Sequence, residues 1–154
     1  MTETKKMTRQ GWMSLLAKAP EGLLGRLWAA AGIEVAHVWL RPPEIGAVMV
    51  RGRAGGTGAP FNLGEMTVTR CALRLEGGPA DGLVGHAYVA GRCREKALVA
   101  ALCDALMQDE VQAVVVRDAV LVPLAQAAAE ARETLAAKAA ATRVEFFTLA
   151  RKRA

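Results

Sequence analysis

The residues best suited to chemistry in this chain of 154 residues are arginines on either side of a glycine-rich loop. Arg51 and Arg53 alternate near the end of an expected strand at 47–53, so both guanidinium groups share one face, roughly 6.6 Å apart along the strand. Guanidinium groups bind phosphate oxygens in bidentate fashion, and glycines let backbone N–H groups turn together toward an anion. The sequence therefore predicts phosphate-binding candidates, namely Arg51, Arg53, Gly55, Gly56, Thr57, Gly58 and, on the following strand, Arg70.

The same loop also fits an ordinary long hairpin turn. Glycine is the default turn residue, and Thr57 could cap the turn with its side chain. No phosphate-binding Walker motif is present, because the loop has no lysine and a strand rather than a helix is expected after it. The dinucleotide-binding glycine fingerprint is excluded for the same reason. A phosphate site and a plain loop both remain open at this stage.

No arrangement of side chains in the sequence indicates a catalytic centre or a metal site. Paired carboxylates, Ser-His-Asp sets and Cys-His sets do not occur at spacings that would bring them together. The cysteines at 71, 93 and 103 form no CxxC pair, and His37 stands alone. We therefore expect no catalytic residue, no metal and no cofactor bound by this chain.

Composition limits the class of protein. Hydrophobic residues make up 53% and charged residues 23%, which is typical of a globular domain, and the net charge is +5. That charge suits an anionic ligand, a nucleic acid or an acidic partner subunit. The sparse, odd number of cysteines favours a reducing cytoplasm. Every apolar run is interrupted by charge before it reaches about 18 residues, so we expect no membrane-spanning segment.

Hydrophobic periodicity predicts an α+β fold in a single domain, 1–154. Apolar residues at helical spacing predict N-terminal helices within 9–31. Alternation predicts an antiparallel meander at 33–90 of about four strands, with the glycine-rich loop at 52–64 and Pro42-Pro43 ending the first strand. A helical part follows at 92–154, with one long amphipathic helix to about 107 that packs on the sheet, an uncertain stretch at 111–122, and a C-terminal helical extension from 123 to 141. If the strands on both sides of the loop pair, Arg51, Arg53 and Arg70 would gather at the loop mouth.

Large apolar residues near both ends of the chain suggest contacts with another protein. Trp12 and Met13 lie on a short N-terminal helix, and Arg143, Phe146 and Phe147 lie close to the C-terminus. Adjacent phenylalanines are seldom left in water, so they either fold back on their own core or anchor a partner. The same alternatives hold for Trp12. We take these five residues as candidate docking residues.

Several segments together resemble the PhnG family, the G subunit of the bacterial carbon–phosphorus lyase core complex. The similar segments are 9–13, 53–58 with 67–70, 88–92 and 142–148, in the order and spacing of that family. The resemblance implies an accessory subunit that works with partner subunits of the H, I and L types. That assembly would transfer ribose triphosphate from its substrate ATP to an alkylphosphonate and release adenine, and the product would pass to the J subunit.

The resemblance also implies that the nucleosidase chemistry belongs mainly to the I subunit, so no catalytic residue is assigned here. Two alternatives remain, a purely structural assembly subunit and a basic nucleic-acid-binding module. The second is less favoured, because aromatic residues make up only 5% and form no stacking pair on adjacent strands.

The sequence departs from the family in the first turn of the long helix. The family commonly has an acidic residue, a histidine and a glutamate where this chain has Cys93, Lys96 and Leu98. Cysteine accepts backbone N–H bonds less well than aspartate, which would weaken the helix cap by about 1 kcal/mol. Between Arg92 and Arg94, the Cys93 thiol could also have a lowered pKa.

Overall fold

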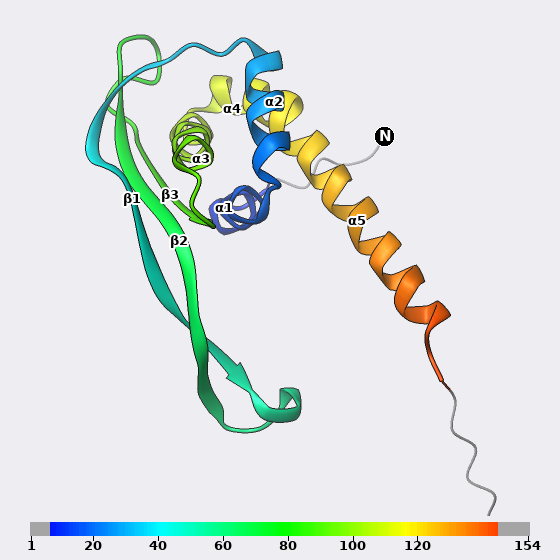
Figure 1. Ribbon diagram of the computed structural model, residues 1–154. Coiled ribbons are helices and arrows are strands. Elements are labelled where there is room, and N and C mark those ends of the chain that lie inside the picture. The colour runs from blue at the N-terminus through cyan, green and yellow to red at the C-terminus, as the bar shows by residue number, and fades with distance from the viewer. Residues whose placement is uncertain (1–6, 145–154) are drawn as a thin grey trace, which may run out of the picture.

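The protein is a three-stranded antiparallel sheet with helices packed against one face (Figure 1). The computed structural model describes residues 7–144. In chain order the elements are α1 (Arg9–Lys18), α2 (Glu21–Ala31), β1 (Ala36–Arg53), β2 (Pro60–Glu76), β3 (Val84–Ala90), α3 (Arg94–Leu106), α4 (Glu110–Val116) and α5 (Val122–Ala141). A short 3-10 turn at Ala54–Gly56 closes the β1–β2 hairpin, and a π-helical turn at Arg117–Leu121 joins α4 to α5.

The predicted α+β class is confirmed, but the described residues form three strands rather than about four. The two strands expected at 33–41 and 47–53 are one continuous strand, β1. Pro42-Pro43 does not end it; the pairing with β2 shifts register between Arg41 and Glu44 and then continues. Both prolines are tolerated because β1 is an edge strand and because the pairing with β2 is interrupted at these two residues, so neither missing N–H is needed in the ladder.

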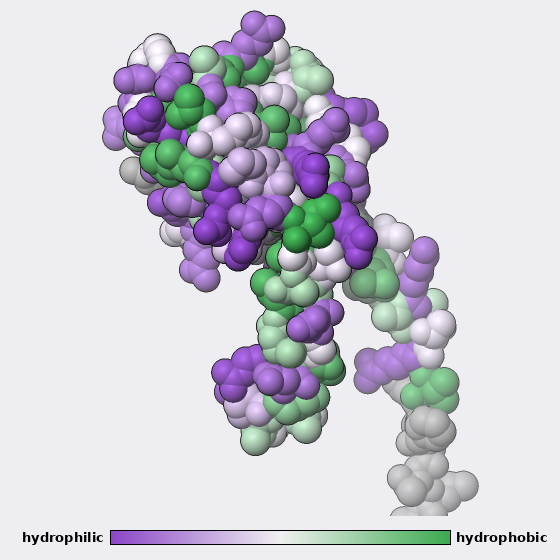
Figure 2. Space-filling view, turned by 60° about the vertical axis from the view of Figure 1, so that its left-hand side comes forward, coloured by the Kyte–Doolittle hydropathy of each residue, from purple (hydrophilic) through white to green (hydrophobic). Residues whose placement is uncertain are grey.

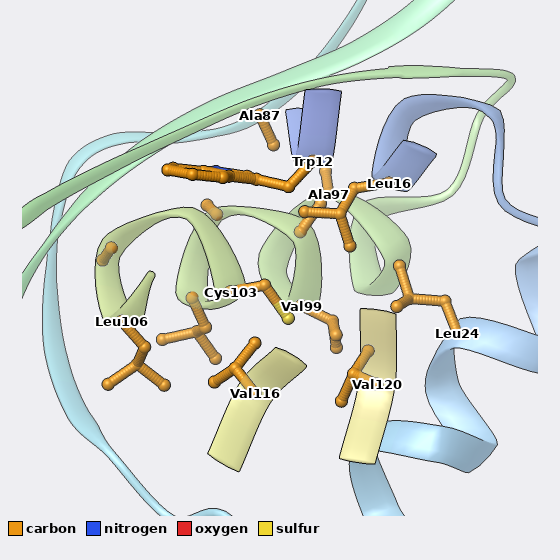
Figure 3. Packing of buried hydrophobic residues seen from close by; sticks show 14 of the residues in the cluster. Trp12, Leu16, Leu24, Ala87, Ala97, Val99, Cys103, Leu106, Val116 and Val120 are labelled. Carbon is orange, nitrogen blue, oxygen red and sulfur yellow. The ribbon is translucent and has the colours of Figure 1, made fainter. Parts of the chain in front are cut away.

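Helix α3 lies at the centre of the core. It packs across the face of the sheet that carries Cys71, Leu73 and Leu75, which are buried as the alternation of β2 predicts. On the opposite side, Val116 and Val120 approach α3 from the α4–α5 run, and Trp12 and Leu16 of α1 cover its flank (Figure 3). The core is therefore built around a single amphipathic helix that is enclosed on several sides.

Local signals explain why the helices begin where they do. The Thr8 side chain accepts a hydrogen bond from the Gly11 amide at 3.2 Å and caps α1. Asp109 caps α4 in the same manner, accepting from the amides of Val111 and Gln112. This cap resolves the uncertain stretch at 111–122, whose valines would otherwise favour a strand. The stretch is helical, and the π-helical turn continues it into α5.

Two elements project from this core (Figure 1). The last residue of β3, Ala90, pairs with Val68, and beyond that point β1 and β2 continue as two strands alone. We call residues 46–67 the hairpin arm. Its β1 side, from residue 46 to 53, extends roughly 23 Å at the rise of an antiparallel strand. Helix α5, of 20 residues, leaves the core on the other side and is exposed from Glu130 to its end.

One helical run, Glu110–Ala141, is long and apolar enough to cross a membrane by length and composition alone. Alanine accounts for much of that apolar character. The large side chains that are buried in this run are Val116, Val120, Leu121 and Leu124, and they pack in the core of the domain.

The close approach of β3 to α3 predicts a sharp effect of adding one carbon at Gly85. A Cβ there would overlap the carbonyl oxygen of Ala101 and lie 2.9 Å from the Ala105 Cβ. Because the obstacle is helix backbone, we expect Gly85→Ala to lower the free energy of unfolding by about 3 kcal/mol, measured by urea denaturation. The matched control is Gly46→Ala in the hairpin arm, where a Cβ meets nothing within 4 Å. Equal stability of the two variants would contradict this packing.

Candidate functional site

The predicted phosphate-binding loop forms the tip of the hairpin arm. A shallow hollow of about 560 Å³ lies there, lined by Arg51, Gly52, Arg53, Gly56 and Pro60. Arg51 pairs with Asn62 and Arg53 with Pro60, so the two arginines keep the alternation that places them on one face. No carboxylate pairs with either guanidinium among residues 7–144. The tip therefore carries two positive charges beside an open hollow.

The loop itself uses part of the hydrogen-bonding capacity that an anion would need. Gly55 and Gly56 have φ values of 59° and 81°, which only glycine adopts easily. However, the N–H groups of Thr57 and Gly58 both donate to the carbonyl oxygen of Ala54. In addition, Arg53 Nη1 donates to the Gly58 carbonyl oxygen at 3.1 Å. Arg51 thus remains the arginine of the tip with no hydrogen-bond partner in the described part of the chain.

Arg70 does not join this tip, so the predicted gathering of three arginines at the loop mouth is wrong. Arg70 lies opposite Glu44 and Tyr88 in the three-stranded part of the sheet and forms an ion pair with Glu44 at 3.2 Å. Ten residues of β2 separate it from Pro60, which is roughly 33 Å at the strand rise. The long, continuous pairing of β1 with β2 is the physical reason, because it places the turn far from residue 70.

The hairpin arm also exposes large apolar side chains on both of its faces. Met49 pairs with Glu65 and Met66 pairs with Val48; neighbouring pairs of a ribbon point to opposite faces. The exposed large apolar residues of the arm are Met49, Phe61, Leu63 and Met66, with Ile45 at its base. Figure 2 shows the arm standing clear of the core, with hydrophobic and hydrophilic residues both at its surface. No helix of the described chain covers either face.

A buried carboxylate that the sequence analysis did not single out connects three elements of the core, away from the hairpin arm. Asp104 of α3 is 0% exposed. Arg9 donates to its two oxygens from Nε at 3.1 Å and from Nη2 at 2.7 Å, and Trp12 Nε1 donates at 2.9 Å. The backbone amide of His86 in β3 donates at 3.0 Å. The carboxylate therefore ties α1 and β3 to α3, and its hydrogen bond raises the pKa of Arg9.

This network changes the interpretation of the N-terminal docking candidates. Trp12 is only 8% exposed, and its ring packs over α3 in Figure 3, so its role is in the core and not at a surface for a partner. Met13 is half-buried beside it and lines a hollow between α1 and β3. Arg143 is exposed just beyond α5. Phe146 and Phe147 lie outside the described residues, so their docking role stays a prediction.

The first turn of α3 differs from the expectation for Cys93. Its Sγ does cap the helix, accepting from the Lys96 amide at 3.3 Å. Burial raises the pKa of the Cys93 thiol, and a hydrogen bond with Glu21 acts in the same direction, so the suggested lowered pKa is wrong. Lys96 is buried as well, and its Nζ donates to the Ala17 carbonyl oxygen at 3.0 Å. Burial lowers the pKa of this amine.

Within residues 7–144, no group of three or more His, Cys, Asp and Glu side chains is placed to hold a metal ion. The features of the described chain that remain candidates for binding are the hairpin arm with its arginine tip and the hollow between α1 and β3.

Two comparisons connect this architecture to known proteins. A family model described as phosphonate metabolism protein PhnG matches residues 7–152. A curated relative from Rhizobium meliloti (strain 1021) is 42% identical over 143 residues, which cover 93% of this chain and 88% of the relative. That relative is named as alpha-D-ribose 1-methylphosphonate 5-triphosphate synthase subunit PhnG.

The Asp104 network predicts a large loss of stability when its charge is removed. In Asp104→Asn, one oxygen becomes an NH2 group that cannot accept from Arg9 or the His86 amide. We expect the free energy of unfolding to fall by roughly 3 kcal/mol, reduced somewhat by the half-exposed position of Arg9. Chemical denaturation followed by tryptophan fluorescence measures this directly.

The matched control for Asp104→Asn is Asp118→Asn, which removes an exposed carboxylate paired with Arg117 at 3.3 Å. That change should alter stability by less than about 0.5 kcal/mol. If both variants unfold at the same denaturant concentration, Asp104 does not hold α1 and β3 in the way described.

Proposed function

Because this chain belongs to the PhnG family of phosphonate metabolism proteins, we propose that it is an accessory subunit of an alpha-D-ribose 1-methylphosphonate 5-triphosphate synthase. The observation that carries the proposal is the match to a subunit of that enzyme across nearly the whole chain. In the proposed reaction, an alkylphosphonate oxygen replaces adenine on the ribose of ATP, and adenine leaves. ATP and the phosphonate are substrates of the assembly, and this chain binds no cofactor of its own.

The described residues support an accessory role and not a catalytic one. Neither of the two conspicuous polar clusters has the groups of a catalytic centre, because Asp104 is fully buried with its donors in place and the arm tip carries cations without a general base. We propose that bond breaking takes place on partner subunits of the H, I and L types, chiefly on the I type. The product would then pass to the J type. The cytoplasm, where the three thiols stay reduced, is the proposed location.

The hairpin arm supports assembly with these partners. A two-stranded ribbon is marginally stable by itself in water, and this one has large apolar side chains on both faces. The arm cannot fold back to bury both faces against its own core. Partner subunits that enclose the arm would remove this apolar surface from water.

The open hollow beside Arg51 supports a second role for the hairpin arm, in which it contacts a phosphate group. Since no described carboxylate neutralises Arg51, the arm could bring a guanidinium to a phosphate group held mainly by a partner subunit. A purely structural arm is the alternative.

A nucleic-acid-binding role gains less support from the structure. On the sheet, Arg41 and Arg70 both pair with Glu44, and Arg74 pairs with Glu76, so these charges are largely compensated.

Omission of this chain provides the direct test of the proposed function. The subunits should be co-expressed with and without it, purified through a tag on a partner, and supplied with ATP and methylphosphonate. We expect adenine release only when this chain is present. The Arg26→Ala variant, which changes an exposed residue of α2 outside the hairpin arm, serves as a positive control. Full adenine release without the chain, or recovery of this chain free of partners when the partners are co-expressed, would refute the proposal.

A second experiment separates a ligand role of Arg51 from a structural one. Loss of one charge-assisted hydrogen bond to phosphate is worth roughly 1.5–3 kcal/mol, which corresponds to about a 10- to 100-fold fall in adenine release for Arg51→Ala. The assembled complex should form normally. Arg26→Ala, which removes an exposed arginine on α2, should have no such effect. If Arg51→Ala instead prevents assembly, the arm is structural and the phosphate contact is rejected.

A further inference from the structure

The outer edge of β3 is only partly closed. The backbone N–H and C=O groups of the odd-numbered residues of β3 point toward β2. The odd-numbered residues on either side of the strand show this, because the Leu83 carbonyl oxygen accepts from the Leu75 amide and the Gly91 amide donates to the Thr67 carbonyl oxygen. Even-numbered residues therefore direct theirs outward, and two of these outward groups have side-chain partners. The His86 amide donates to Asp104, and the Val84 carbonyl oxygen accepts from Gln108 Nε2 at 2.8 Å. Side chains of α3 and of the turn after it thus replace a fourth strand along the first half of the edge.

Residues 7–144 provide no such cover for the second half of the same edge. The His86 carbonyl oxygen, both backbone groups of Tyr88 and the Ala90 amide point outward in the same ladder. Hydrogen bonds to these atoms are absent in the described part of the chain. Unpaired donors and acceptors along an edge form a template for another extended chain. The fold therefore closes one half of the strand and leaves the other half available.

A groove lies beside this open half. It has a volume of about 480 Å³ and separates β3 from α1. Its walls are mostly apolar, and the α1 residues that line it are Arg9, Gln10, Met13, Ser14, Leu16 and Ala17. Arg9 is half-exposed and donates hydrogen bonds to Asp104 from Nε and Nη2. The other N–H groups of its guanidinium are therefore left for the open side of the groove.

We propose that an extended, acidic segment of a partner subunit pairs with β3 in this groove and becomes a fourth strand of the sheet. The open edge accommodates about four residues of extended chain. Its backbone would pair with Tyr88 and its neighbours, alternate side chains would contact Met13 and Ala17, and a carboxylate would lie next to Arg9. This inference rests on the proposed function, because it requires a partner subunit.

Charge and geometry favour a different protein over a second copy of this chain. The net charge of +5 opposes self-association and attracts an acidic segment. A second copy would bring its whole sheet and its own α1 to this edge, whereas the groove between β3 and α1 has a volume of only about 480 Å³. A single extended segment avoids that collision.

Amide hydrogen exchange, resolved to single residues, tests the proposal in the isolated full chain and in the co-expressed complex. The amides of Tyr88 and Ala90 should exchange rapidly in the isolated chain, whereas those of Ala87 and Val89, which face β2, should be slow in both samples. On assembly we expect the Tyr88 amide to slow by about 100-fold or more. The His86 amide, bonded to Asp104 in both, serves as an internal reference.

The other outcomes each overturn the inference. A complex that forms while the Tyr88 amide stays rapid rejects the fourth strand and leaves the proposed function standing. Failure of any complex to form rejects both. A Tyr88 amide that is already slow in the isolated chain means that another part of the chain, or a second copy, occupies the edge.

A pair of substitutions on α1 provides an independent test. Gln10→Trp places a large side chain into the groove, whereas Lys18→Trp adds the same side chain to the same helix in the separate hollow between α1 and α5. Recovery of partner subunits should fall at least about 10-fold for Gln10→Trp and stay unchanged for Lys18→Trp, with similar thermal unfolding of both isolated chains. Equal recovery of partners would contradict the proposal.

Discussion

The buried carboxylate of Asp104 is the interaction on which the arrangement of this fold depends. It lies on the central helix, and donors from α1 and β3 converge on its two oxygens. A buried charge without partners would cost several kcal/mol, so α1 and β3 must both be in place when α3 packs on the sheet. The network does more to specify the position of α1 than to add net stability, since a buried ion pair often contributes little compared with an apolar substitute.

The position of α1 in turn determines which part of the sheet remains accessible. Arg9 and Trp12 hold the helix alongside β3 but not in contact with the whole of its edge, which produces the groove. The same carboxylate occupies the edge at His86 and prevents a longer strand from adding there. One side chain therefore joins three elements and also sets the limit of the open edge.

The chain divides its apolar residues between a core that is complete and surfaces that are not. Leu73, Leu75 and Leu106 are fully enclosed, whereas Leu63 in the hairpin arm is 66% exposed. This division fits the proposed role as a subunit: the body packs around α3, and partner chains are proposed to bury the projecting elements. The alanine-rich α5 can remain helical while exposed because alanine has the highest helix propensity. Within residues 7–144, the hairpin arm is supported by its strand pairing and by the hydrogen bonds of its own tip.

The sequence by itself determined the elements that follow from local periodicity and capping. The helices at 9–31, the central helix before residue 107 and an antiparallel meander within 33–90 were all predicted, because helical spacing and strict alternation are properties of neighbouring residues. The sequence also indicated the arginines of the hairpin tip. Only the tertiary structure decided that Pro42-Pro43 lies within one long strand, that Arg70 is far from Arg51, and that Trp12 belongs to the core. The tertiary structure also showed that Asp104 is buried together with its hydrogen-bond donors. In the sequence, a single aspartate in an apolar helix is only a weak signal of such a network. The physical reason is that strand register and the partners of a buried charge depend on residues that are distant in the chain, and local sequence patterns carry no information about those distances.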